Sequence, residues 1–291
     1  VAADGQYVHP VTVDEFRIAV AETFDVIVEP SGQDAFTVFA QDSGRTGYVS
    51  GTLAVREGLR APIPPLDPRP ILTMNDMGMG GHDMSQMDGT RDPVALAGHD
   101  MSQMPNEPAE SGMDHSGMDM SETPADGSGM PGMSGGSMAG MNHGGGMQTH
   151  PASENGNPLV DNQAMAPKSR LDDPGNGLRG NGRKVLSYAM LKSAFADPDG
   201  RDPGREIELH LTGHMEKFAW SFNGRKMSAA DPIRLTYGER MRIVLVNDTM
   251  MTHPIHLHGM WSDLEDDQGN FLVRKHTIDM PPGSKRSYRV R

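Results

Sequence analysis

Met241-Arg242-Ile243-Val244-Leu245-Val246-Asn247 is the stretch that decides the fold class of this chain. Its length and its β-branched residues are typical of a buried β-strand. Just before it, Gly238-Glu239 is a turn signal, and residues 233–237 ahead of that turn predict a partner strand. Just after it, the chain runs through five residues into a group of histidines. This part of the chain is therefore predicted to form a β-sheet.

The same signals recur on both sides of this stretch. Further strands are predicted at residues 24–29, 35–40, 47–49, 51–55, 206–212 and 271–280, several of them bounded by turn residues such as Pro30-Ser31-Gly32 and Pro281-Pro282-Gly283. Many short strands separated by turn residues indicate an all-β fold of the sandwich type. The sequence begins and ends within stretches that are typical of β-strands, so we expect two β-sandwiches that are each incomplete.

Composition divides the chain into three parts. Residues 1–57 and 181–291 carry the strand patterns, and residues 58–180 form a linker that opens with a proline-rich exit. From Met74 to His150 the only branched aliphatic residues are Val94 and Leu96, and no aromatic residue occurs. Such a segment buries too little apolar surface to offset the entropy of ordering it, so we expect a long disordered insertion.

Charge and residue usage exclude several classes of protein. With 26 basic and 39 acidic residues the net charge is −13, which repels nucleic acid and attracts cations. Cysteine is absent, which excludes disulfides, zinc–thiolate sites and cysteine nucleophiles in this sequence. No apolar run reaches the length of about 18 residues that a membrane-spanning helix needs.

The most specific motif is His253-Pro254-Ile255-His256-Leu257-His258-Gly259. On an extended strand His256 and His258 point to the same face, about 7 Å apart along the chain. Each imidazole can then bind a different ion of a close cluster, while His253 serves another site across the bend at Pro254. Imidazole is a common ligand of copper, zinc, iron and nickel. The alternative is three histidines held by ordinary hydrogen bonds.

Methionine is the outlier of the composition, because 15 of the 24 methionines lie between residues 74 and 150. The sequence Gly-His-Asp-Met-Ser-Gln-Met occurs at residues 81–87 and again unchanged at 98–104. Thioether sulfur is soft and neutral, so it favours Cu(I) over zinc or magnesium. The predicted Cu(I)-recruiting residues of this Met/His repeat region are His82, Met84, Met87, His99, Met101, Met104, Met113, His115, Met118, Met120, Met141, His143 and Met147. An inert spacer is the alternative.

With these motifs the chain resembles the multicopper oxidases, and within them the bacterial copper-resistance proteins. The resemblance rests on residues 42–48 and 51–56, on the Met/His repeats, and on residues 246–264 with the histidine motif. It implies cupredoxin-like β-sandwiches. Residues 1–57 would be the end of the second sandwich, residues 181–291 most of the third, and residues 58–180 a copper-binding linker between them.

The resemblance also implies copper as the cofactor, in type 1, type 2 and type 3 centres. His253 would be a ligand of the type 1 copper, His256 of the type 2 copper and His258 of one type 3 copper. The whole enzyme would oxidise Cu(I) or a phenol-like reductant and reduce O2 to water, and would act in copper resistance. The family's type 1 cysteine and its other histidine pairs are missing from this sequence, so we expect the chain alone to be inactive.

Two other functions compete with the oxidase. A non-catalytic copper-sequestering or chaperone protein would depend on the Met/His repeats alone. A zinc or iron hydrolase would use the histidine motif, but no paired acid or nucleophile stands at a suitable spacing. The family also implies a periplasmic location, with copper ions, O2 and periplasmic copper-resistance proteins as partners.

The remaining histidines outside these motifs are His9, His210, His214 and His276. Each is interpreted as an ordinary hydrogen-bonded or solvated imidazole. Met250 and Met251 precede His253 directly, and core packing is the favoured interpretation for both.

Overall fold

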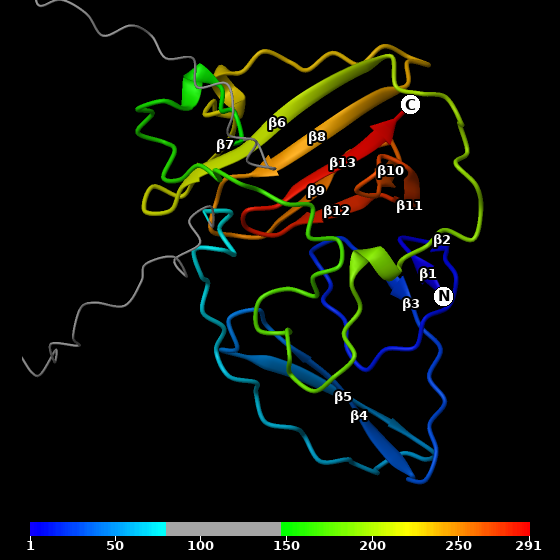
Figure 1. The fold of residues 1–291 in the computed structure, drawn as a ribbon. Helices are drawn as coiled ribbons and strands as arrows, with labels where there is room; N and C mark the ends of the chain where they lie inside the picture. The colour runs from blue at the N-terminus through cyan, green and yellow to red at the C-terminus, as the bar shows by residue number, and fades with distance from the viewer. Residues whose placement is uncertain (80–146) are drawn as a thin grey trace, which may run out of the picture. The chain divides into compact units, whose positions relative to one another are not determined.

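The structure is a computed structural model that describes residues 1–79 and 147–291. Its largest sheet is built around β8 (Met241–Asn247), the strand predicted above, whose apolar side chains are buried. The other strands of this sheet are β6 (Arg205–His214), β7 (Ala219–Phe222), β10 (Ser262–Glu265), β11 (Phe271–Lys275) and β13 (Lys285–Val290). Their order is β11-β10-β13-β8-β6-β7, and β6 and β8 run parallel whereas the other neighbours are antiparallel (Figure 1).

A second, two-stranded sheet contains the histidine motif. β9 (His253–His256) pairs antiparallel with β12 (Thr277–Met280). Ile278 and Met280 of β12 are fully buried and join the same core as Leu245 of β8 and Leu264 of β10. Two sheets therefore enclose one apolar core, which is the arrangement of a sandwich.

The predicted strand at residues 271–280 is two strands that belong to different sheets. The break falls at His276, between β11 and β12. There the backbone N–H groups of His276 and Thr277 donate to Oδ2 of Asp4, at 3.1 and 3.2 Å, instead of continuing the β11 ladder. A side chain from the start of the chain thus divides a continuous apolar pattern. The strand predicted at residues 233–237 is wrong, because this stretch is an exposed loop.

The first part of the chain forms two small sheets. β1 (Ala2–Ala3), β2 (Gln6–Tyr7) and β3 (Phe24–Asp25) make one, and β4 (Ala35–Gln41) and β5 (Tyr48–Ala54) form an antiparallel hairpin. The predicted strand at 24–29 is shorter than expected, because residues 26–28 are exposed. Ala3 and Val8 belong to the same core as β8. The division of residues 1–57 from 181–291 into separate sandwiches stays a prediction.

Residues 147–180 are ordered and partly buried, whereas their composition predicts a disordered linker. Leu171 and Leu178 are buried, and the amide of Ala166 donates to the carbonyl of Gly78 at 2.7 Å. Short 3-10 helices lie here and further along the chain: η2 (Ala152–Glu154), η3 (Tyr188–Met190) and η4 (Met227–Ala229). Most of the Met/His repeat region, from residue 80 to residue 146, lies outside the described residues.

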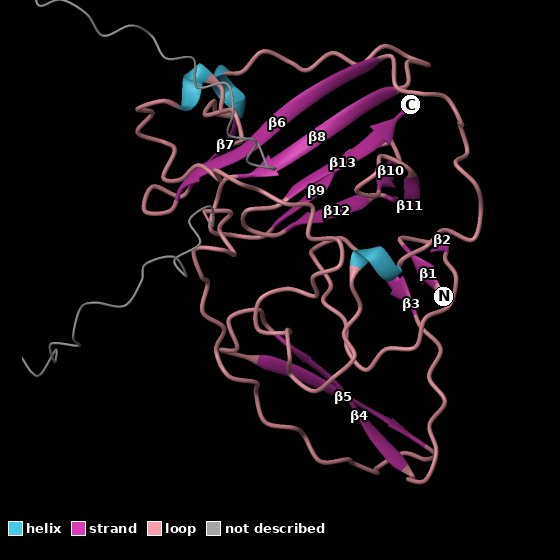
Figure 2. Ribbon diagram, in the orientation of Figure 1, coloured by secondary structure: helices cyan, strands magenta, loops and turns pink. Residues whose placement is uncertain are grey.

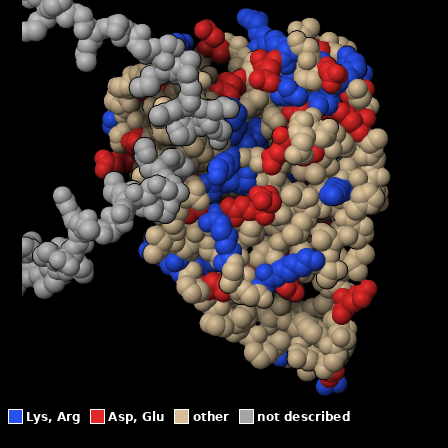
Figure 3. Space-filling model, viewed as in Figure 1, with Lys and Arg blue, Asp and Glu red and all other residues tan. Residues whose placement is uncertain are grey.

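Strands and loops make up nearly all of the described chain (Figure 2). No helix in residues 1–79 or 147–291 is long and apolar enough to cross a membrane. These residues carry 25 of the basic and 29 of the acidic side chains, and the face drawn in Figure 3 shows both signs interspersed. Most of the net negative charge therefore comes from residues 80–146.

Candidate metal centre

The connection from β8 to β9 fixes where the histidine motif lies. Asn247, the last residue of β8, is fully buried, and its side-chain amide donates to the carbonyl oxygens of Met251 (2.7 Å) and Met280 (2.8 Å). Its side-chain oxygen accepts hydrogen bonds from the backbone and hydroxyl of Thr249, both at 2.9 Å. The buried side chain of Asn247 therefore links the turn after β8 to the end of β12. β9 begins directly after this turn and pairs with β12.

His256 and His258 lie together at the exposed end of β9. Their ring centroids are 4.9 Å apart, at an interplanar angle of 71°. The strand ends at His256, and His258 lies in a turn followed by Gly259, whose φ is +75°. The expectation that both lie on the strand is thus wrong for His258. The turn nevertheless leaves both rings exposed and close to each other.

The hydrogen bond of His256 fixes which of its nitrogens faces outward. Nδ1 lies 2.6 Å from the carbonyl oxygen of His276, which can only accept a hydrogen bond. Nδ1 therefore carries the proton, and the lone pair of Nε2 is free for a metal ion. A second nitrogen held by a backbone carbonyl is the usual way in which proteins orient a metal-binding histidine.

His276 itself is a third imidazole beside this pair. Its ring centroid lies 5.4 Å from that of His256 and 5.9 Å from that of Trp261. The sequence pattern predicts only an ordinary role for His276, since 20 residues separate it from His256. The pairing of β12 with β9, which sets Thr277 opposite His256, brings them together.

His253 lies at the other end of β9 and is half-buried. Its Nε2 is 2.7 Å from the hydroxyl of Thr249, and its ring centroid is 5.3 Å from that of Trp220. Burial lowers the pKa of His253, only partly opposed by the charge of Asp279. The ring is therefore neutral at pH 7, as a metal-binding imidazole must be.

Two families of known proteins match parts of this sequence. A family described as "Multicopper oxidase" matches residues 200–291, and a second family with the same description matches residues 1–58. Together these matches cover more than half of the chain.

The chain belongs to the multicopper oxidases. It is 66% identical to "Copper resistance protein A" of Escherichia coli and 67% identical to the protein of that name from Pseudomonas syringae pv. tomato. Both matches cover 100% of this chain and 47% of the relative, so the chain spans about half the length of these relatives.

More distant multicopper oxidases match shorter parts of the chain. "Multicopper oxidase MmcO" of Mycobacterium tuberculosis is 34% identical over 35% of this chain and 20% of its own length. Among solved structures, Lac15 from a marine microbial metagenome is 23% identical, with a TM-score of 0.25, over 38% of this chain and 26% of its own. The strands of the structure confirm the all-β fold expected from the sequence, and membership of the multicopper oxidases makes it cupredoxin-like, with copper as the metal of the family.

Copper fits the donors that the described residues of this multicopper oxidase present. His256 is exposed and the carbonyl of His276 holds its Nδ1, which leaves Nε2 for a metal ion, whereas Thr249 holds Nε2 of His253 and leaves its Nδ1. Neutral imidazole nitrogen suits both oxidation states that copper adopts in proteins. The assignment of His253, His256 and His258 to particular copper centres stays a prediction.

The remaining predicted residues have mixed outcomes. Met250 and Met251 are 41% and 40% exposed, so the prediction of core packing is wrong for both. Met147, the last residue of the Met/His repeat region, is 75% exposed, and the other predicted Cu(I)-recruiting residues lie outside the described part of the chain.

The histidines outside the motifs have different surroundings: His9 is exposed, and His214 lies 3.5 Å from Asp161. His210 is buried in a cluster of charged groups that the sequence did not predict.

Proposed function

We propose that this chain contributes copper ligands to a multicopper oxidase that acts in copper resistance, with Cu(I) as its substrate. The observation that supports this function best is the pair of exposed rings of His256 and His258, 4.9 Å apart, beside a third imidazole. The two relatives named "Copper resistance protein A", identical at two of every three positions, support the same proposal.

The protein's own groups prepare the imidazoles for copper. The carbonyl of His276 holds the proton of His256 on Nδ1 and keeps Nε2 free, and Thr249 fixes the ring of His253 through Nε2. We assign His253 to the type 1 centre, His256 to the type 2 centre and His258 to a type 3 copper. When bound, the copper centres supply one-electron oxidation of Cu(I) and the reduction of O2 to water.

The chain by itself is expected to bind copper without turning over. It has no cysteine, so a thiolate-ligated type 1 centre cannot form from these residues alone. As the resemblance implies, we place the whole protein in the periplasm, with other copper-resistance proteins as its partners.

A second candidate function is Cu(I) sequestration by the Met/His repeats without catalysis. The unchanged recurrence of residues 81–87 at 98–104 favours it, because each copy joins two thioethers to one imidazole. The two functions are compatible in one protein, since the repeats and the histidine motif use different residues.

Binding of Cu²⁺ to the metal-free chain tests the proposal. Titration followed by electron paramagnetic resonance should show that the double variant His256→Gln, His258→Gln binds fewer Cu²⁺ ions than the wild type. The nitrogen hyperfine pattern of the ions that these two imidazoles hold should disappear with them, because both ligands are removed.

The matched control is His9→Gln, which removes an exposed histidine outside the motif. It should bind as many ions as the wild type. An unchanged stoichiometry in the double variant would contradict the proposal. Supplied with Cu(I), the wild-type chain should consume O2 no faster than the buffer does.

A further inference from the structure

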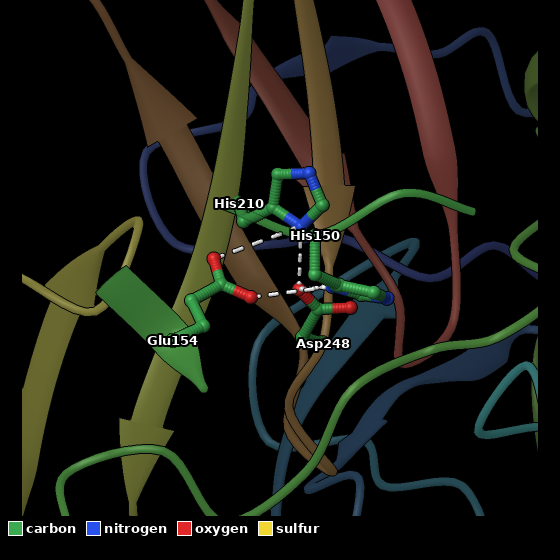
Figure 4. Close-up of side chains that lie close together, drawn as sticks. All are labelled: His150, Glu154, His210 and Asp248. Atoms are coloured by element: carbon green, nitrogen blue, oxygen red, sulfur yellow. Dashed lines mark hydrogen bonds and ion pairs between the residues drawn. The ribbon is translucent and has the colours of Figure 1, made fainter. Parts of the chain in front are cut away.

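A second group of metal-ligand side chains lies away from the histidine motif. His150 precedes η2, and Glu154 is its last residue. His210 lies in β6, and Asp248 follows the end of the parallel strand β8. One ligand atom from each of the four lies within 4.8 Å of all the others, and the four side chains converge in Figure 4. Nothing in the local sequence pattern links them.

These four side chains are buried far more deeply than the histidine motif. The exposed fractions are 8% for His150, 1% for His210 and zero for both carboxylates. One oxygen of the Glu154 carboxylate, Oε1, is buried without a hydrogen-bond partner and lies 3.8 Å from Nδ1 of His210.

Hydrogen bonds outside the group turn one ring nitrogen of each histidine toward its centre. Nε2 of His150 lies 3.2 Å from the carbonyl oxygen of Ala164, and Nε2 of His210 lies 3.1 Å from the carboxylate of Glu208. Both of these oxygens only accept, so each Nε2 carries a proton and each Nδ1 faces the carboxylates of the group, His150 at 3.2 Å from Glu154 and His210 at 2.7 Å from Asp248. Without an ion these short contacts need protons on Nδ1, and a metal ion that displaces these protons gains the Nδ1 lone pairs as ligands.

The carboxylates are positioned in the same way. Oδ1 of Asp248 accepts a hydrogen bond of 2.7 Å from the amide of Ala164, which leaves Oδ2 facing the imidazoles. The side-chain amide of Gln163 donates to Oε2 of Glu154 at 3.2 Å. Such supporting contacts orient the ligands of protein metal sites.

The separations match the first coordination sphere of a small metal ion. A tetrahedral ion with bonds of about 2.0–2.1 Å holds its ligand atoms about 3.3 Å apart. From Nδ1 of His150 the nearest oxygens of Glu154 and Asp248 are at 3.2 and 3.4 Å. From Nδ1 of His210 the corresponding distances are 3.8 and 2.7 Å.

We propose that His150, Glu154, His210 and Asp248 bind one divalent transition-metal ion, Zn²⁺ or Cu²⁺, that fastens residues 147–166 to β6 and β8. Two carboxylates and two neutral imidazoles carry a charge of −2, which a divalent ion neutralises in a buried place. Cu(I) prefers softer ligands, and Mg²⁺ and Ca²⁺ prefer six or more oxygens.

The site lies beside the proposed type 1 ligand without sharing a residue with it. Asp248 is followed by Thr249, whose hydroxyl lies 2.7 Å from Nε2 of His253. His150 follows Met147, at the end of the Met/His repeat region, by three residues. A bound ion therefore ties the chain that leaves the repeats to the turn that positions His253.

The test uses the full 291-residue chain freed of metal, titrated separately with Zn²⁺, Cu²⁺ and Mg²⁺. Wild-type protein should bind Zn²⁺ or Cu²⁺ at a site that Glu154→Gln lacks, and this ion should raise the melting temperature of the wild type more than that of the variant. Mg²⁺ should have no effect. X-ray absorption of the wild type loaded with one equivalent of Zn²⁺ should show four nitrogen or oxygen neighbours at about 2.0–2.1 Å and the outer-shell scattering of two imidazoles, a readout that does not depend on the folding of any variant.

The matched control is His214→Gln, which removes another imidazole paired with a carboxylate, Asp161. It should keep the binding site, as should the double variant at His256 and His258, so that this proposal and the proposed function fail independently. Equal ion binding by wild type and Glu154→Gln would overturn the inference. So would a melting temperature that no ion changes, since protons would then hold the four groups together.

Discussion

At the scale of single residues, Lys275 shows how buried charge joins distant parts of the chain. Its side chain is fully buried, and Nζ lies 2.9 Å from Asp4 and 3.1 Å from Glu22. The same ammonium group lies over the rings of Phe24 and Tyr188, 5.2 and 5.3 Å from their centroids. Two carboxylates from the start of the chain therefore depend on one cation near its end.

Replacing Lys275 by methionine should destabilise the protein strongly. The carboxylates of Asp4 and Glu22 would stay buried without their cation, and loss of one partner of a buried ion pair costs about 3–5 kcal/mol. Urea denaturation would measure the free energy of unfolding. Arg205→Met is the matched control: Arg205 is 40% exposed and pairs with Glu239, so solvent screens the pair and its loss should cost far less than the loss of Lys275. Equal losses would refute the argument.

At the scale of secondary-structure elements, Glu265 of β10 ties three strands together. Its carboxylate accepts hydrogen bonds from Arg242 of β8 at 2.8 Å and from Arg289 of β13 at 2.5 Å. Burial raises the pKa of Glu265, but hydrogen bonds from Arg242, Ser287 and Arg289 outweigh it, so the pKa lies below its ordinary value of 4.5. The ionised form is therefore the one that holds the sheet.

The sign of this pKa shift predicts sensitivity to acid. A carboxylate with a lowered pKa in the folded state stabilises the fold above its unfolded pKa, and this stabilisation disappears as the pH falls through the folded value. Glu265→Gln should therefore lose less stability than the wild type between about pH 6 and about pH 3. Urea denaturation across this range would measure the effect.

Glu206→Gln is the comparison for this measurement. Glu206 contacts the same Arg242, at 3.2 Å, but its side chain is 54% exposed. This variant should follow the wild-type profile. A Glu265→Gln profile that is as steep as the wild type would show that the carboxylate does not link the strands in the way described.

At the scale of the whole molecule, charge and methionine are concentrated apart from the sheets. The described residues are nearly balanced in charge, with 29 acidic and 25 basic side chains, whereas residues 80–146 contain ten acidic side chains and one arginine. Soft sulfur ligands surrounded by negative charge favour the capture of Cu(I). In the function proposed above, the repeats collect Cu(I) and the imidazole sites hold borderline ions.

Changing Met84, Met87, Met101 and Met104 to leucine should lower the number of Cu(I) ions that the full chain binds. Leucine keeps the apolar volume and removes the sulfur ligand. Anaerobic competition with a Cu(I) chelator would measure the stoichiometry. The control is Met227→Leu, which removes a methionine that is 95% exposed outside the repeats. Unchanged stoichiometry in the fourfold variant would remove the repeats from the proposed function.

The sequence by itself determined the local features of this protein. Periodicity and β-branching predicted β8, β6 and the hairpin of β4 and β5, because these signals depend on neighbouring residues. The tight spacing of His253, His256 and His258 marked the histidine motif for the same reason. The exposed loop at residues 233–237 shows the limit, since an apolar run forms a strand only where a neighbouring strand is available to pair with it.

Only the tertiary structure decided which distant residues meet. The order of strands sets β6 beside β8, so that His210 and Asp248 face the loop that carries His150 and Glu154. The pairing of β9 with β12 likewise brings His276 to His256. Contacts across a sheet depend on which strands are neighbours, and no periodicity along the chain encodes that choice.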